Sequence, residues 1–309
     1  MDVSNSKYLI ETPKFFWTPK LERLDFTGCT NLIQVHPSIG HLTELVFLSL
    51  QNCSSLVDLD FGSVSNLSSL RVLRLCGCTK LEKTPDFTGA SNLQYLDMDG
   101  CTSLSTVHES IGALTKLKFL SFRNCTNLVG MPNSVKMMKS LVTLDFCGCL
   151  ELTTLPLRWT YSSYMTSLIF LDLSFCNLHE VPDGIGKLRT LERLNLQGNK
   201  FDSLPNGLYG LESLAYMNLS HCHELQTIGL LPSKGVSSGG RYFEITAGSR
   251  DHRSGLYIFD CPKIMKKPEN QSMEIEYTWL RRLLEVRMLL IFRQFSSFNI
   301  LIQCYFSSL

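Results

Sequence analysis

The chain has 309 residues, of which 44% are hydrophobic, and its formal net charge is +1. This balance is typical of a folded protein and gives no electrostatic reason to expect a nucleic-acid partner. The longest apolar stretch, residues 283–302, is interrupted by Glu285, Arg287 and Arg293, so the sequence predicts no membrane span. Residues 1–20 lack the basic start and apolar run of a secretory signal peptide.

The first 20 residues carry part of a pattern that recurs along the chain. Met1, Val3, Ser6 and Leu9 have the same spacing as anchors in the segments that follow. We therefore expect residues 1–20 to form a partial repeat.

Residues 21–229 contain nine fuller repeats. Each repeat places apolar anchors at offsets 0, +3 and +5, and seven of the nine have a further leucine at +11. Offset +8 is cysteine in eight repeats and Asn199 in the other. The repeats begin at Leu21, Leu45, Leu70, Leu93, Leu117, Leu141, Leu168, Leu191 and Leu214. A period of 23 to 27 residues is typical of a solenoid, in which each unit buries its apolar side against its neighbours.

Within each repeat, the pattern predicts one short strand. Offsets +3 and +5 point to one face of a strand and offset +4 to the other, and offset +4 is polar in all nine repeats. One strand per repeat predicts a parallel inner sheet. The apolar pairs in the second half of each repeat, such as Ile111 with Leu114, have the three-residue step of a short helical turn on the outer side. The fold expected is an α/β solenoid that bends into an arc.

Two segments depart from the period. An insertion, residues 158–165, contains Trp159, Tyr161 and Tyr164, and either forms part of a binding face or packs as a loop. After Leu225 the period is lost, and residues 230–309 are expected to form an irregular tail with a short strand at 256–261, a helix at 277–292 and an apolar strand at 298–305.

These motifs carry a resemblance to a known family. The pattern L-x-x-L-x-L-x-x-C/N-x-L identifies the leucine-rich repeats and predicts a horseshoe-shaped solenoid. Pieces such as LERLDFTGCTNLIQVHPSIG and TPDFTGASNLQYLDMDGCTSL resemble plant intracellular immune receptors of the TIR–nucleotide-binding–leucine-rich-repeat class. The piece LYIFDCPKI resembles the start of the jelly-roll-like domain that follows the repeats in those receptors. The resemblance implies recognition of a pathogen effector or a host protein in the cytoplasm, or contact with the nucleotide-binding domain of a parent receptor.

The candidate partner-binding residues lie at offsets +2, +4 and +6 on the concave inner face of the solenoid, where the strand side chains point outward from the core. Aromatic and arginine side chains are common anchors of protein interfaces, and large apolar groups beside a polar column are unfavourable in water unless a partner covers them. The alternative is that these side chains pack on one another as a ladder. The predicted set is Arg74, Tyr95, Asp97, Phe119, Arg123, Phe170, Asp172 and Tyr216.

No catalytic, cofactor-binding or metal-binding residues are predicted. No phosphate-binding G-x-x-x-x-G-K-[ST] motif is present, and Cys76 with Cys78 has no second ligand pair at a suitable spacing for zinc. His221 and His223 lack the spacing of a metalloprotease, and His36 and His108 stand where other repeats have turn prolines. A column of buried thiols favours a reducing compartment, the cytoplasm or the nucleus. Two alternatives stay open, namely a cell-surface repeat receptor fragment and a truncated product with no activity of its own.

Overall fold

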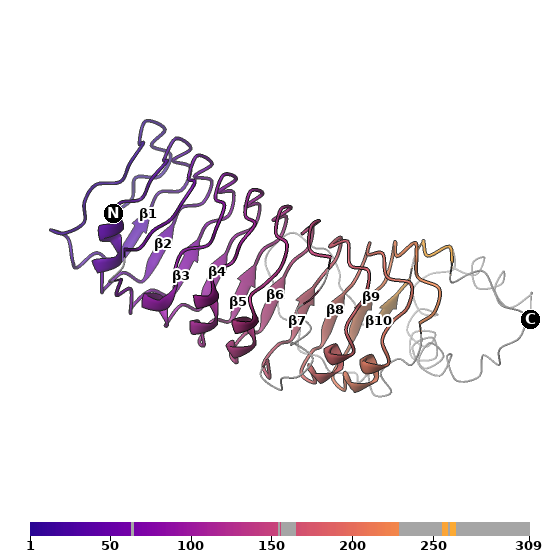
Figure 1. Ribbon diagram of the computed structural model, residues 1–309. Coiled ribbons are helices and arrows are strands. Elements are labelled where there is room, and N and C mark those ends of the chain that lie inside the picture. The colour runs from indigo at the N-terminus through magenta and orange to yellow at the C-terminus, as the bar shows by residue number, and fades with distance from the viewer. Residues whose placement is uncertain (63–64, 154, 156–164, 229–254, 259, 264–309) are drawn as a thin grey trace, which may run out of the picture. The chain divides into compact units, whose positions relative to one another are not determined.

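The computed structural model describes residues 1–62, 65–153, 155, 165–228, 255–258 and 260–263. In this part of the chain, ten three-residue strands form a single parallel sheet whose spatial order follows the sequence (Figure 1). The strands are β1 Arg23–Asp25, β2 Phe47–Ser49, β3 Val72–Arg74, β4 Tyr95–Asp97, β5 Phe119–Ser121, β6 Thr143–Asp145, β7 Phe170–Asp172, β8 Arg193–Asn195, β9 Tyr216–Asn218 and β10 Gly255–Tyr257. The predicted solenoid with one strand per repeat is confirmed.

A second row of elements, short 3-10 helical turns, accompanies the strands (Figure 1). Their bounds are η1 Pro37–His41, η2 Thr88–Ala90, η3 Glu109–Ala113, η4 Asn133–Met137, η6 Asp183–Lys187 and η7 Asn206–Gly210. Pro132, Pro182 and Pro205 each stand directly before a turn, where proline's fixed φ fits and no strand pairing is needed. Within the described residues, no helix is both long enough and apolar enough to cross a lipid bilayer.

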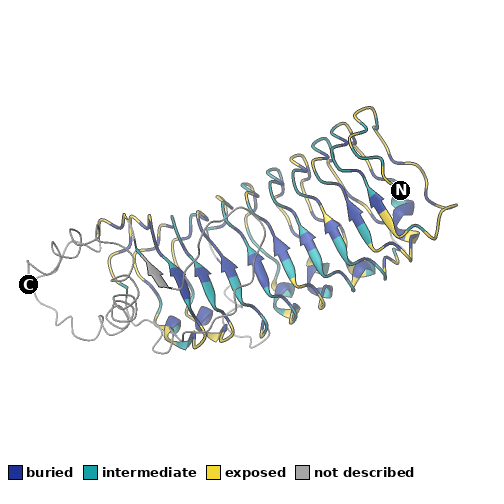
Figure 2. Cartoon of the chain, turned by 180° about the vertical axis from the view of Figure 1, so that it is seen from behind, coloured by how far each residue is buried: buried dark blue, intermediate teal, exposed yellow. Residues whose placement is uncertain are grey.

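The middle residue of each strand from β1 to β9 is buried, as the sequence predicts, whereas the residues on either side of it range from exposed to buried (Figure 2). The +3 and +5 side chains, such as Leu96 and Met98, are completely buried, and so are Leu24 and Phe146 in other coils. Aligned partners keep the same register from coil to coil, with Leu73 opposite Leu96 and Leu96 opposite Leu120. One continuous core therefore runs under β1 to β9.

The cysteines at offset +8 form a ladder of hydrogen bonds through this core. Each Sγ donates to the backbone carbonyl of the +5 residue in the preceding coil, at 3.0–3.3 Å, as Cys101 does to Leu75 and Cys125 does to Met98. Burial raises the pKa of Cys53 and of Cys149 to about 12, so these thiols keep the proton that they donate. Among the described residues, the cysteines are thiols and form no disulfide.

Asn199 occupies the same slot and makes more bonds than a cysteine can. Its Nδ2 donates to the carbonyls of Leu173 and Leu196 at 2.8 and 2.9 Å, and its Oδ1 accepts from the N–H of Leu178. The prediction that cysteine and asparagine fill one structural position is confirmed.

The chain turns sharply at offset +7, where the backbone adopts a positive φ. Glycine takes this conformation without steric strain, and Gly28, Gly77 and Gly100 do so at φ of 70–76°. Asparagine stands there in other coils, and Phe175, His221 and Asp260 take the same conformation at 54–60°. The coil therefore requires a positive φ at offset +7 whichever residue stands there.

The sheet ladder extends past the nine repeats at both ends. At the N-terminal end, Asp2 pairs with Asp25 in a parallel bridge. The sheet also continues beyond the nine repeats, because β10 pairs with β9 in the same parallel register and Cys261 donates to Leu219 as the other +8 cysteines do to their neighbours. The predicted helix at 277–292, the strand at 298–305 and the insertion residues Trp159, Tyr161 and Tyr164 lie outside the described residues.

Candidate functional site: the outward face of the strands

The polar side chains at offset +4 have a structural role that strand alternation does not reveal. In eight of the nine repeats the +4 oxygen accepts a hydrogen bond from the backbone N–H two residues later, and so closes the turn at the end of the strand. Arg74 is the exception among the nine. This bond satisfies an N–H that leaves the sheet ladder, and it explains why a side-chain oxygen recurs at this position.

The first half of the face carries a row of rings and guanidinium groups, which we call the aromatic row: Arg23, Phe47, Arg74, Tyr95 and Phe119. The rings of Tyr95 and Phe119 are stacked, with centroids 4.4 Å apart and planes inclined by 5°. Because these two residues are aligned partners in β4 and β5, the sheet register itself brings the rings together.

Arginines flank the rings of the aromatic row. The Arg23 guanidinium lies 3.6 Å from the centroid of the Phe47 ring, and the Arg74 guanidinium lies 5.8 Å from the rings of both Phe47 and Tyr95. These are cation–π distances. The three rings remain only half-buried and both arginines are exposed. In this half of the face the side chains therefore do pack on one another as a ladder, which was the alternative to a binding role. Solvent nevertheless still reaches the surface of this ladder.

Tyr95 also contacts the +4 column. Its hydroxyl donates to Asp97 at 3.3 Å, and Asp97 accepts from the N–H of Asp99. Partial burial, together with the nearby Asp97 charge, raises the pKa of Tyr95 to about 12, so it is a neutral donor at physiological pH.

The second half of the face is organised by two carboxylates, Asp145 and Asp172, which we call the carboxylate pair. Asp145 accepts from Arg123 Nε at 3.2 Å and from the N–H of Cys147. Burial, together with the charge of Asp172, raises the pKa of Asp145 to about 6. Arg123 opposes this shift without cancelling it.

Asp172 is the more deeply buried member of the pair, with 4% of its surface exposed. It accepts from the N–H and hydroxyl of Ser174 and from Asn195 Nδ2, at 2.5–3.1 Å. Tyr216 is likewise buried, and the Arg193 guanidinium lies 4.8 Å from its ring, whereas Phe170 is half-buried. The predicted residues thus fall into two neighbourhoods along the sheet, and Asp172 and Tyr216 offer little surface to a partner.

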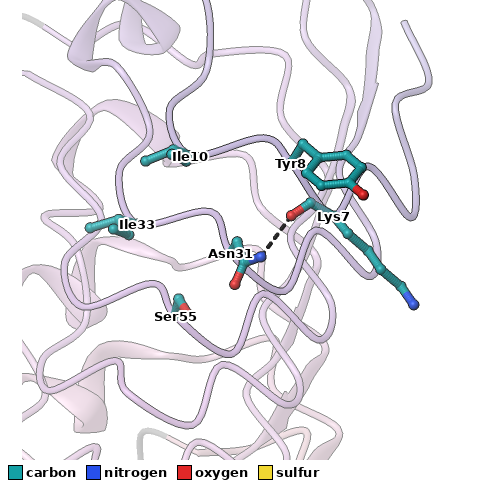
Figure 3. A pocket seen from close by; sticks show the side chains of 6 residues that line it. All are labelled: Lys7, Tyr8, Ile10, Asn31, Ile33 and Ser55. Atoms are coloured by element: carbon teal, nitrogen blue, oxygen red, sulfur yellow. Dashed lines mark hydrogen bonds between the residues drawn. The ribbon is translucent and has the colours of Figure 1, made fainter.

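A shallow hollow of about 290 Å³ lies on the first coils (Figure 3). Asn31 Nδ2 closes one side by donating to the carbonyl of Lys7 at 2.7 Å. The lining includes no carboxylate, thiol or imidazole. Its lining residues are Lys7, Tyr8, Ile10, Asn31, Ile33 and Ser55.

The histidines take two different positions. Nδ1 of His36 and of His108 accepts from the N–H of a serine two residues later and so caps a 3-10 turn, as expected of turn residues. Two other histidines, His221 and His223, converge with Asp260 at the far end of the sheet, where their ligand-type atoms lie within 4.8 Å of one another. Sequence spacing did not indicate this group, because Asp260 is 39 residues from His221.

Comparison with known proteins places these features in a family. A leucine-rich repeat region model matches residues 24–154, and a second leucine rich repeat model matches residues 166–223. TMV resistance protein N of Nicotiana glutinosa is 31% identical over 284 residues, covering 75% of this chain and 24% of that protein.

Two proteins of Arabidopsis thaliana are also similar. SUPPRESSOR OF npr1-1, CONSTITUTIVE 1 is 31% identical over 70% of this chain and 14% of its own length. Disease resistance protein RPP2A is 37% identical over 37% of this chain and 8% of its own length. The chain thus spans a quarter or less of the length of these relatives. The resemblance to plant disease resistance proteins is confirmed.

Proposed function

Because the chain belongs to the leucine-rich repeat proteins and its repeats are homologous to those of plant disease resistance proteins, we propose that it is a recognition module in plant defence. Its outward strand face binds a protein, either a pathogen effector or a host protein. A third candidate partner is also a protein, namely the nucleotide-binding domain of a parent receptor.

The observation that carries this proposal is the aromatic row. Stacked rings and the guanidinium groups beside them have few conformations left to lose, so a partner that covers them loses little side-chain entropy on binding. The row combines this rigidity with solvent access. Aromatic and arginine side chains of this kind supply most of the binding energy in many protein interfaces.

Arg74 gives the row a polar anchor. Among the described residues it forms no ion pair with a carboxylate, and it is the one repeat residue at +4 that does not close its own turn. Its guanidinium can therefore pair with an acidic group of the partner in a bidentate contact. We propose that the partner presents an apolar surface with a carboxylate near Arg74.

The buried thiols support a reducing location for this activity. Their pKa values are raised by burial and they serve as hydrogen-bond donors, a role that oxidation would remove. We propose that the module works in the cytoplasm or the nucleus, and that it binds rather than catalyses.

Affinity capture from infected leaf tissue tests the proposal. The tagged chain would be compared with Phe119→Ala and Phe170→Ala, and with Val129→Ala as a control at an exposed apolar residue off the strand face. We expect a protein that is retained by the wild type and by Val129→Ala and lost with Phe119→Ala. Identical recovery with all four chains would contradict a role for this face.

A further inference from the structure

The coil geometry brings Asp260 beside two histidines. Leu256 is aligned with Met217, so Asp260 and His221, each four residues further on, occupy the same +7 turn position in adjacent coils. Both residues have a positive φ, of 54° and 60°. His223 follows two residues later, on the same edge as His221.

A single oxygen, Asp260 Oδ2, faces both imidazoles. It lies 3.1 Å from His221 Nδ1 and 3.8 Å from His223 Nε2. The shorter distance is a hydrogen bond, but the longer one is not, so hydrogen bonding alone does not account for the approach of the second ring. The rings are inclined by 58°, with centroids 6.3 Å apart, so they reach the oxygen from different directions.

We propose that His221, His223 and Asp260 form a site for a zinc-type divalent metal ion that joins the tenth coil to the ninth. Bonds of 2.0–2.2 Å to imidazole nitrogen and carboxylate oxygen put neighbouring ligand atoms of a tetrahedron about 3.3 Å apart. The two distances to Asp260 lie on either side of this value. Two imidazoles and one carboxylate suit Zn²⁺ better than Mg²⁺ or Ca²⁺, which prefer oxygen ligands alone.

The surroundings are consistent with an open site. All three residues are exposed, so their side chains can adjust around an ion and a water can take the fourth position. The nearby cation, Lys263, is engaged in an ion pair with Glu224. This ion pair joins the same two coils, so the metal would add a second link at one edge.

The site has a mechanical consequence. His221 and Asp260 are separated by 39 residues in the chain, and an ion bound by both would close that loop and hold β10 against β9. Metal binding should therefore slow amide hydrogen exchange in residues 255–263.

Titration of the full chain with Zn²⁺ tests the proposal. The protein would be stripped of metal, kept reduced with a non-thiol reductant and titrated at pH 7.5 by calorimetry. We expect one equivalent to bind, and His223→Ala and Asp260→Asn each to weaken binding by at least about tenfold, as loss of a direct ligand should exceed the effect of a supporting residue. His179→Ala is the matched control, since His179 is exposed and lies outside the cluster.

A Co²⁺ spectrum and hydrogen exchange separate this site from a thiol site. We expect visible bands without thiolate charge transfer, and slower exchange at 255–263 in the wild type but not in His223→Ala. The proposal is overturned by the absence of binding, by equal affinity in His223→Ala and the wild type, or by a thiolate signature, which would assign the ion to cysteines.

Discussion

The two halves of the strand face share a backbone and a core but differ in what their outward side chains contact. In the aromatic row, rings stack on one another and on arginines while staying half-exposed. In the second half, the carboxylate pair is bonded to its own turns and to Arg123 and Asn195. The solenoid's own hydrogen bonds therefore explain the polar column, whereas the half-exposed rings are the part that a partner can still cover.

The substitutions expected to change stability most are in the core, and they test whether one core lies under both halves of the face. Leu96 under the aromatic row and Leu171 under the carboxylate pair are both completely buried at offset +3. We expect Leu96→Ala and Leu171→Ala each to lower the free energy of unfolding by about 2–5 kcal/mol, because each leaves a cavity in close-packed surroundings. Urea denaturation measures both. Absence of a loss at either position would show that the core is not continuous.

A smaller loss of stability is expected at offset +4, and it should differ between Asp172 and Asp97. Asp172→Ala removes acceptors for Ser174 and Asn195 in a buried setting, and we expect a loss of about 1–3 kcal/mol. Asp97→Ala removes one turn bond and a contact with the Tyr95 hydroxyl at a half-buried site, so its loss should be smaller. The same denaturation series compares them. Equal losses would mean that the two carboxylates have equivalent roles.

The carboxylate pair should also make stability depend on pH. The folded-state pKa of Asp145, about 6, is above the 3.8 of an unperturbed aspartate, so the folded state binds this proton more tightly and the resulting stabilisation is lost as pH rises through 6. Because of this group, we expect the free energy of unfolding to fall by about 1 kcal/mol as the pH is raised from 5 to 8. Asp145→Asn should abolish that part of the pH dependence. Asp97→Asn, which leaves Asp145 intact, should retain it, and a wild-type profile in Asp145→Asn would refute the assignment.

The smallest effect concerns the Tyr95 hydroxyl. Tyr95→Phe removes a single 3.3 Å bond to Asp97 and keeps the ring stacked on Phe119, so we expect a loss of about 0.5 kcal/mol. Tyr95→Ala also removes the stacked pair and should cost about 1 kcal/mol more. Thermal unfolding of the two variants separates ring from hydroxyl. If Tyr95→Phe were as damaging as Tyr95→Ala, the ring stack would contribute nothing.

Periodicity was sufficient to predict the fold because burial follows directly from spacing. Offsets +3 and +5 point to the same face of a strand, so the spacing alone predicts that Leu96 and Phe146 are buried. The thiol column could also be predicted, since a small donor at a repeated buried position has the neighbouring coil as its partner.

The candidate site was less predictable because alternation gives the direction of a side chain and not its bonds. Nothing in the spacing distinguishes Asp172, which its neighbours cover, from Asp97, which stays half-exposed. The tenth strand was not recognised as part of the sheet because about 30 residues separate Leu225 from Leu256. For the same reason the approach of Asp260 to His221 could not be anticipated, although each precedes a cysteine of the buried column.

The most direct test of the central claim is photo-crosslinking from single positions of the full chain in infected leaf cells. A photoreactive phenylalanine analogue would replace Phe47 or Phe119 in the aromatic row, and in a separate chain Val129, which is 62% exposed but lies off the strand face. The account predicts that both aromatic-row positions crosslink to the same protein and that position 129 does not. A partner captured from position 129 and from neither ring position would contradict it.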